Sequence, residues 1–406
     1  MSAILGILRD GQFLSRERIR LWTIAILIGF ALGLVYLAVT AHGINDYKGR
    51  PLGSDFSDVY AAGSLANDGH AAQAFDPAHH FAREREIFGK DTQFYGWHYP
   101  PFFLLIAAPL ARLPYLPALL IWQIATLALY LAALRPLLRD VKDGTWILAA
   151  LAFPAVFVNL THGHNGFLTA ALVACALNVL DSRPLLAGLC FGLLAYKPQF
   201  GAMIPLVLAA TGRWRTFGAA AATVAILALI VTALFGAAVW PAFLAGTHFT
   251  REVVLEQGNT GFYKIQTGFA WARMWGASVP VAYGAQALVS GAAAAGLIWL
   301  WRSPANMARK GAALCIAMLL ATPYALDYDM MVLAPAIALL AAEGLAQGFK
   351  PYERAILLAL WAVPILAREV AEYTAIPLGV LAMIGAFAML LPLNPISIRS
   401  RLLRHA

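Results

Sequence analysis

Two aspartates near the start of the chain carry the first pattern that could do chemistry. Asp55 and Asp58 lie in GSDFSDVYAAG, residues 53–63, soon after the first long apolar run. Their i, i+3 spacing places both carboxylates on one face if a helix begins there. Carboxylates beside lipid cost desolvation energy, so they usually mark functional sites. A second interpretation stays open, in which Asp55 is only an N-cap and Asp58 an acidic residue of the first turn.

A single lysine lies where two short apolar runs meet. Lys197, in AYKPQF, is followed by Pro198, which breaks the helix there. An ammonium at a membrane boundary is well placed to bind a phosphate that stays embedded through a lipid tail. The alternative is a lysine that snorkels and only marks a helix end.

Histidine and amide side chains gather in two further segments. THGHNG contains His164 and Asn165, and WHYPP contains His98 and Tyr99. The two histidines of THGHNG, at i and i+2, do not share a helix face and have no HExxH or Cys partner, so a zinc site is only weakly indicated. Hydrogen bonds to sugar hydroxyls or phosphate suit these side chains. A capped turn and an interfacial anchor, respectively, are the structural alternatives.

Charged residues beside two later apolar runs complete the candidate set. TPYALDYD places Asp327 and Asp329 where an apolar run begins, and helix capping by Asp327 is the alternative to function. The polar stretch 238–279 holds Lys264 and Arg273 among tryptophans, a pattern typical of an aromatic belt at a membrane boundary. Both cations could meet lipid phosphates.

These residues need a membrane-embedded scaffold to position them. Of 406 residues, 61% are hydrophobic and 12% charged, and many apolar runs follow one another. This composition predicts an all-α polytopic membrane protein. The net charge of +8 requires no nucleic-acid partner, because basic residues set membrane topology. The three cysteines all lie in apolar runs, so neither a disulfide framework nor a Cys metal cluster is readable.

The first part of the chain predicts one span and one external loop. Residues 21–41 form a retained first span, because no clean signal-peptide cleavage site follows them. Residues 42–98 form the first external loop. Within it, Asp76 as N-cap and Pro77 in the first turn predict a helix that lies in the membrane interface.

The distribution of basic residues decides how the remaining runs cross. If 97–114 is re-entrant and does not cross, the cytoplasmic side receives the basic turns 135–142, 213–215 and 302–310. This threading predicts about twelve transmembrane helices, both termini in the cytoplasm and a second external loop at 238–279. It also treats residues 1–406 as one integral membrane domain. Nearly every polar motif then lies on the external, periplasmic face of an inner or plasma membrane.

With these motifs in hand, the chain resembles glycosyltransferase family 87. The matching stretches occur in the order SDFSDVYAAGSLANDG, YPPFFLLIAAPLARLP, GHNGFLTAAL, RPLLAGLCFGLLAYKPQFGAMIPL and TPYALDYDMMVLAPA. The resemblance implies a GT-C-like membrane fold and a mannosyltransferase-like activity that uses polyprenyl-phosphate mannose or a related donor. It also implies that Asp55 is the functional aspartate of the first external loop. Where the family commonly has GQNG, this chain has GHNG at His164.

The expected reaction moves a hexose, with mannose first, to a glycolipid or glycan acceptor. Asp55 would act as general base in an in-line, inverting attack, and Lys197 would hold the donor phosphate with help from Arg273. No cofactor or metal is required, and the partners are the lipid-linked donor, the acceptor and membrane lipids. The residues expected to position sugar or acceptor are Asp58, His98, Tyr99, His164, Asn165, Gln266 and Asp327.

Two other classes of protein remain open from the sequence. A secondary transporter also builds its site from broken helices with charges at their junctions. A lipid-linked oligosaccharide ligase is the third possibility, and it would favour external arginines over an essential aspartate. The absence of an evident repeated half argues against the transporter.

Overall fold

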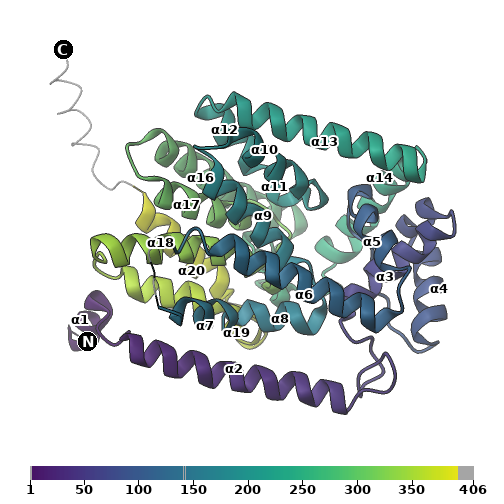
Figure 1. Ribbon diagram of the computed structural model, residues 1–406, viewed down its shortest axis with the longest axis horizontal. Helices are drawn as coiled ribbons and strands as arrows, with labels where there is room; N and C mark the ends of the chain where they lie inside the picture. The colour runs from purple at the N-terminus through teal and green to yellow at the C-terminus, as the bar shows by residue number, and fades with distance from the viewer. Residues whose placement is uncertain (1, 140, 142, 392–406) are drawn as a thin grey trace.

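The computed structural model describes residues 2–139, 141 and 143–391, and in this part the regular secondary structure is helical. Figure 1 shows a bundle with α1 at one end and the short helices α3, α4 and α5 gathered at the opposite end. Helices α2 and α13 run along opposite sides of the bundle, and they are the least buried of the helices long enough to span a membrane. Isolated bridges, such as Ile265 with Leu326, tie loops together.

The helices of the first half alternate long apolar segments with short pieces. They are α1 Ser2–Asp10, α2 Arg16–Val39, α3 Ser54–Asn67, η1 Ala71–Phe75, α4 Pro77–Phe88, η2 Pro101–Phe103, α5 Leu104–Leu110, α6 Tyr115–Leu134, α7 Thr145–Leu151, α8 Pro154–His162, α9 Gly166–Val179, α10 Pro184–Leu193, η3 Leu194–Tyr196, α11 Pro198–Gly201 and α12 Met203–Ala210.

The second half contains the longest inserted loop and the C-terminal helices. They are α13 Trp214–Phe235, α14 Val239–Phe249, the π-helical η4 Thr250–Glu256, η5 Phe262–Lys264, α15 Gly268–Met274, α16 Val279–Arg302, α17 Met307–Leu320, η6 Asp327–Val332, α18 Leu333–Gln347, α19 Glu353–Thr374 and α20 Leu378–Leu390.

Several helices are long and apolar enough to cross a membrane, as predicted. In the described part there are five, and six if α7 and α8, which meet at a 48° bend, count as one span. The predicted number of about twelve is not confirmed. Runs that the hydropathy pattern presented as spans, such as 165–181 and 310–323, form helices α9 and α17 of 14 residues each. A 14-residue helix is about 21 Å long, shorter than the ~30 Å apolar layer.

The segment 97–114 is too irregular to cross the membrane as one helix. It begins as a loop, continues as η2, and ends in α5, whose seven residues extend only about 10 Å. Its re-entrant depth stays a prediction. The C-terminal residues 392–406, which the sequence assigns to the cytoplasm, lie outside the described residues.

The helix predicted from Asp76 and Pro77 is present as α4. Its N-cap Asp76 accepts hydrogen bonds from the backbone N–H groups of Ala78 and His79, both at 3.0 Å, and Pro77 is the first helical residue. These local signals depend only on neighbouring residues, which is why the sequence locates the helix start. Helix α4 packs against α3 and thereby supports the segment that carries the two aspartates.

Candidate active site

Two glycines bring the start of α3 against the end of α8. Gly53 is the N-cap of α3 with φ 68°, and Gly163 is the C-cap of α8 with φ 66°, a region that favours glycine. A Cβ on Gly163 would lie 2.6 Å from the Cβ of Phe56, so a larger residue would push the two helices apart. This close approach places Asp55 next to His162, the last residue of α8.

Asp55 does not cap its helix. The N-cap position belongs to Gly53, no side chain caps α3, and Asp55 lies in the first turn. Its one hydrogen bond in the structure comes from the Ser54 hydroxyl at 3.3 Å. The capping interpretation of Asp55 is therefore wrong, because the chain turns two residues earlier through a left-handed glycine. The Asp55 carboxylate is therefore not used to cap the helix.

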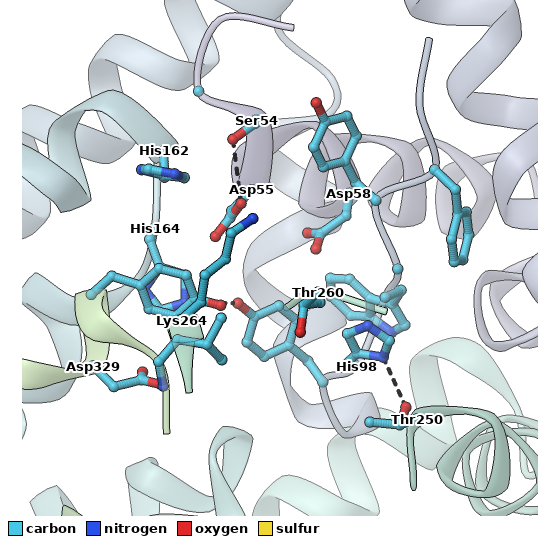
Figure 2. Close-up of a pocket in the computed structure, with 18 of the residues that line it drawn as sticks. Ser54, Asp55, Asp58, His98, His162, His164, Thr250, Thr260, Lys264 and Asp329 are labelled. Carbon is cyan, nitrogen blue, oxygen red and sulfur yellow. Dashed lines mark hydrogen bonds between the residues drawn. The ribbon is translucent and has the colours of Figure 1, made fainter. Parts of the chain in front are cut away.

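Asp55 and Asp58 both line one large cavity at the end of the bundle where α3 and α4 lie. Its volume is about 1000 Å³, and Figure 2 shows the two carboxylates on one side of it. Of the side chains predicted to act, the cavity wall contains Asp55, Asp58, His98, Tyr99, His164 and Lys197. Segments far apart in the sequence thus meet in a single space.

The surroundings of the two aspartates make proton uptake easier than in water. Burial is the main cause that raises the pKa of Asp55, and Asp327 adds to it, while His162 and Lys197 act in the opposite direction. The Asp55 side chain is nevertheless partly exposed to the cavity. Burial, followed by the charges of Asp55 and Glu84, raises the pKa of Asp58 well above its ordinary value. Both carboxyl groups therefore take up a proton more readily than a carboxyl group in water.

Lys197 lies at the junction of η3 and α11 and is already paired. Its Nζ is 2.6 Å from Oδ1 of Asp329, and both side chains are almost fully buried. The His164 ring stacks on Tyr328 with centroids 3.6 Å apart, and its Nε2 is 3.4 Å from both Lys197 Nζ and the Tyr99 hydroxyl. Lys197 therefore anchors a buried polar network that forms part of the cavity wall.

Besides Lys197, the cavity wall contains Arg50, Arg251, Lys264 and Arg368. Arg50 pairs with Asp46, and Arg251 pairs with Glu252 and Glu256. Lys264, at the end of η5, extends toward Asp55 in Figure 2, and among the described residues no carboxylate forms an ion pair with it. Burial and the charge of Arg368 lower the pKa of Lys264. Arg368, on α19, also lines the cavity and donates to Asp327 at 2.7 Å. Lys264 and Arg368 thus add positive charge to the cavity that Asp55 also lines.

His98 joins the segment 42–98 to the segment 238–279. Its Nδ1 is 2.8 Å from the Thr250 hydroxyl at the start of η4 (Figure 2). Burial lowers the pKa of His98 to about 4, so the ring is neutral at physiological pH and acts through hydrogen bonds. The cavity wall beside it contains Thr247, Thr250 and Thr260, whose hydroxyls suit sugar recognition.

Four predicted site residues do not line the cavity. Arg273 donates to the backbone carbonyls of Ala277 and Glu256, at 2.6 and 3.1 Å, and lies over the Phe262 ring. Gln266 and Asn165 are buried, and the Gln266 amide bonds to backbone groups. Asp327 acts on the site through its pairing with Arg368.

The cap predicted at the start of the last polar motif is made by a different acid. Asp329, and not Asp327, accepts the hydrogen bond from the Leu326 backbone N–H, at 3.0 Å. Asp327 instead accepts from the adjacent Tyr328 N–H and pairs with Arg368. The two acids differ because η6 begins as a 3₁₀ turn, in which the third residue faces back toward the cap.

Two residues that line the cavity, Arg368 and Thr250, are not among the residues predicted from the sequence, and the position of a third, His162, follows only from the structure. Arg368 was overlooked because it lies inside a long helix, where the only local signal is an arginine near a predicted external turn. Thr250 carries no local signal. His162, as part of THGHNG, is expected only to bond sugar hydroxyls or phosphate, and the packing of α3 on α8 places it beside Asp55.

The fold and the cavity define a polytopic helical membrane protein whose polar cavity brings carboxylates and cations together next to apolar spans. A family model for glycosyltransferase family 87 matches residues 97–323, more than half of the chain. The chain belongs to this family and is a membrane glycosyltransferase, as the motif resemblance predicted; family membership does not support the transporter interpretation. The matched range contains Lys264 but begins after Asp55 and Asp58. No curated protein and no solved structure matches the chain.

Proposed function

We propose that this glycosyltransferase moves a hexose, most simply mannose, from a polyprenyl-phosphate donor to a glycolipid or glycan acceptor. The observation that carries the proposal is the meeting of Asp55, Lys264 and Arg368 in one cavity. A carboxylate with a raised pKa and two nearby cations are what base-assisted displacement of a phosphate requires. The cavity volume of about 1000 Å³ gives room for two substrates.

The reaction needs only one displacement. Asp55 accepts the proton of the acceptor hydroxyl as its oxygen forms a bond to the anomeric carbon. The bond from that carbon to the phosphate oxygen breaks, and its electron pair leaves with polyprenyl phosphate. Because the attack is in line with the leaving group, the anomeric configuration inverts. Asp58, His98, Tyr99 and His164 would orient the acceptor or the sugar.

The donor phosphate would bind on the side of Lys264 and Arg368. Lys264 has no carboxylate partner among the described residues, so a phosphate is a stronger partner than its present surroundings offer. Lys197, which the sequence motif assigns to the phosphate, has its charge balanced by Asp329, and Arg368 has its charge balanced by Asp327. In this proposal Lys197 contributes from the inner wall, and Lys264 makes the direct contact.

The activity can be tested with purified protein in detergent. Incubation with polyprenyl-phosphate mannose and a glycolipid acceptor should release polyprenyl phosphate and mannosylate the acceptor. Parallel donors with arabinose or glucose identify the sugar. If none of these donors releases polyprenyl phosphate, the proposed donor class is wrong.

Removal of the Lys264 ammonium should weaken donor use. A lost charge-assisted contact costs about 1.5–3 kcal/mol, so Lys264→Ala should raise the donor KM roughly 10- to 150-fold. Lys264→Arg should retain part of the affinity because the charge remains. The control is Lys48→Ala, since Lys48 is exposed and lies outside the cavity. An unchanged donor KM in Lys264→Ala would remove this residue from the phosphate site.

The external location of the cavity is part of the proposal and rests on the charge of the loops. Cysteines introduced at Asp91 and Gly258, in the two external loops, should react with an impermeant thiol reagent added to intact cells. Cysteines at Gly212 and Ala305, in basic turns, should react only after permeabilisation. Labelling of the Gly212 position from outside would reverse the topology.

A further inference from the structure

One side of the cavity is formed by the first membrane span. Gly33, Tyr36 and Leu37 of α2 line it, and their i, i+3, i+4 spacing places them on one face of the helix. Phe157 and Thr161 of α8 also line the cavity, next to these residues of α2. The cavity thus continues from the polar site into a seam between α2 and α8.

This seam lies at the depth of the acyl chains. Gly33 is about 9 Å from the end of α2 at Val39, at 1.5 Å per residue. The outer face of α2 near the same level is apolar and exposed, with Leu32 at 65% and Val35 at 57%. A seam bordered by lipid-facing apolar residues is unsuited to a free sugar and suited to a hydrocarbon chain.

The packing of α2 against α8 is tight at the inner end and open above it. Phe30 stacks on Phe157 with ring centroids 4.7 Å apart, and a Cβ on Gly33 would lie 3.0 Å from the same Phe157 ring. One turn further out, the Tyr36 side chain is 51% exposed. Among the described residues, no hydrogen bond joins α2 to α8, so only apolar contacts hold the seam.

The phosphate-binding side of the cavity adjoins this seam. Helix α8 ends at His162, and the centroid of its ring lies 6.2 Å from that of Tyr328. Tyr328 follows Asp327 in the sequence, and Asp327 forms an ion pair with Arg368. The other flank, at α14 and η4, presents Thr247 and Thr250 together with Arg251, which pairs with Glu252 and Glu256 at 3.6 and 3.5 Å. An apolar chain in the α2–α8 seam would therefore place its phosphate toward the cations.

We propose that the seam between α2 and α8 holds the polyisoprenyl chain of the donor, with its phosphate directed toward Lys264 and Arg368. The inference rests on the proposed function for the identity of the donor. It assigns to α2 a role in substrate binding, with Leu37 at the mouth of the seam and Gly33 near its closed end.

Chain-length selectivity tests the assignment. Leu37→Trp should raise the KM for a long-chain polyprenyl-phosphate mannose about tenfold or more and leave a methyl-phosphate-mannose donor, which has no isoprene units, within about twofold, because only a donor with an isoprenoid chain enters the seam. Val39→Trp is the matched control, since Val39 points outward and does not line the cavity. A second pair is Gly33→Leu with Gly29→Leu, as a Cβ at Gly29 meets nothing within 4 Å. Equal effects on both donors would overturn the proposal.

A binding measurement separates this inference from the reaction. A photoreactive side chain at Leu37 should crosslink polyprenyl phosphate in vesicles of neutral phospholipid, and excess unlabelled polyprenyl phosphate should suppress the crosslink. The same group at Val39 should give a crosslink that polyprenyl phosphate does not suppress. Crosslinking at Leu37 without sugar transfer would uphold the tail site and reject the proposed reaction. Sugar transfer without a competed crosslink would reject the tail site alone.

Discussion

Asp55→Asn should lower turnover about 10²- to 10⁴-fold, the usual contribution of a positioned general base. The substitution keeps the size of the side chain and removes its ability to accept the acceptor proton. Helix α3 should form normally because Gly53, and not Asp55, occupies its N-cap. Donor KM and the unfolding temperature should stay near those of the parent protein. An active Asp55→Asn enzyme would reject the base assignment.

The pH profile provides a second readout of the same residue. Because burial raises the pKa of Asp55, the acid limb of kcat/KM should lie above the ordinary range of a carboxyl group. As the pH falls through that pKa, Asp55 takes up a proton and can no longer act as base, so the rate falls. Asp58→Asn is the comparison variant: its carboxyl favours the neutral form, which Asn resembles, so the loss should be much smaller.

Removal of one partner of the Lys197–Asp329 ion pair should lower the stability of the folded protein. Breaking a buried ion pair by removing one partner costs roughly 3–5 kcal/mol, because the remaining charge stays buried without compensation. Lys197→Met and Asp329→Asn should each lower the unfolding temperature in detergent. The double variant Lys197→Met/Asp329→Leu should recover most of the stability, since replacing both charges by apolar groups is often neutral.

Activity in the double variant distinguishes two roles of Lys197. If its ammonium also contributes to phosphate binding, stability should return while donor KM stays high. Recovery of both stability and donor use would leave Lys197 with a purely structural role. Arg213→Met is the control, because the Arg213–Asp181 pair is partly exposed, at 26% and 59%, and ion pairs that reach solvent contribute at most about 1 kcal/mol.

Much of the scaffold was predictable because it depends on local patterns. The apolar composition identified a helical membrane protein, and Asp76 with Pro77 identified the start of α4. The number of spans was not predictable in the same way. Hydropathy shows that a run such as 310–323 is apolar, but it does not distinguish a helix surrounded by protein from one surrounded by lipid. Helix α17, which this run forms, is mostly enclosed by other helices.

The candidate site divides along the same line. The sequence by itself identified Asp55, Lys197 and the family to which the chain belongs, because charged residues at the ends of apolar runs can be recognised without a structure. Only the tertiary structure decided that Asp55 is no cap and that Lys197 meets Asp329, 132 residues away. It also decided that Lys264 and Arg368 face the cavity. The physical reason is that spacing along a chain sets the face of a helix, while partners across helices follow from how the helices cross and pack.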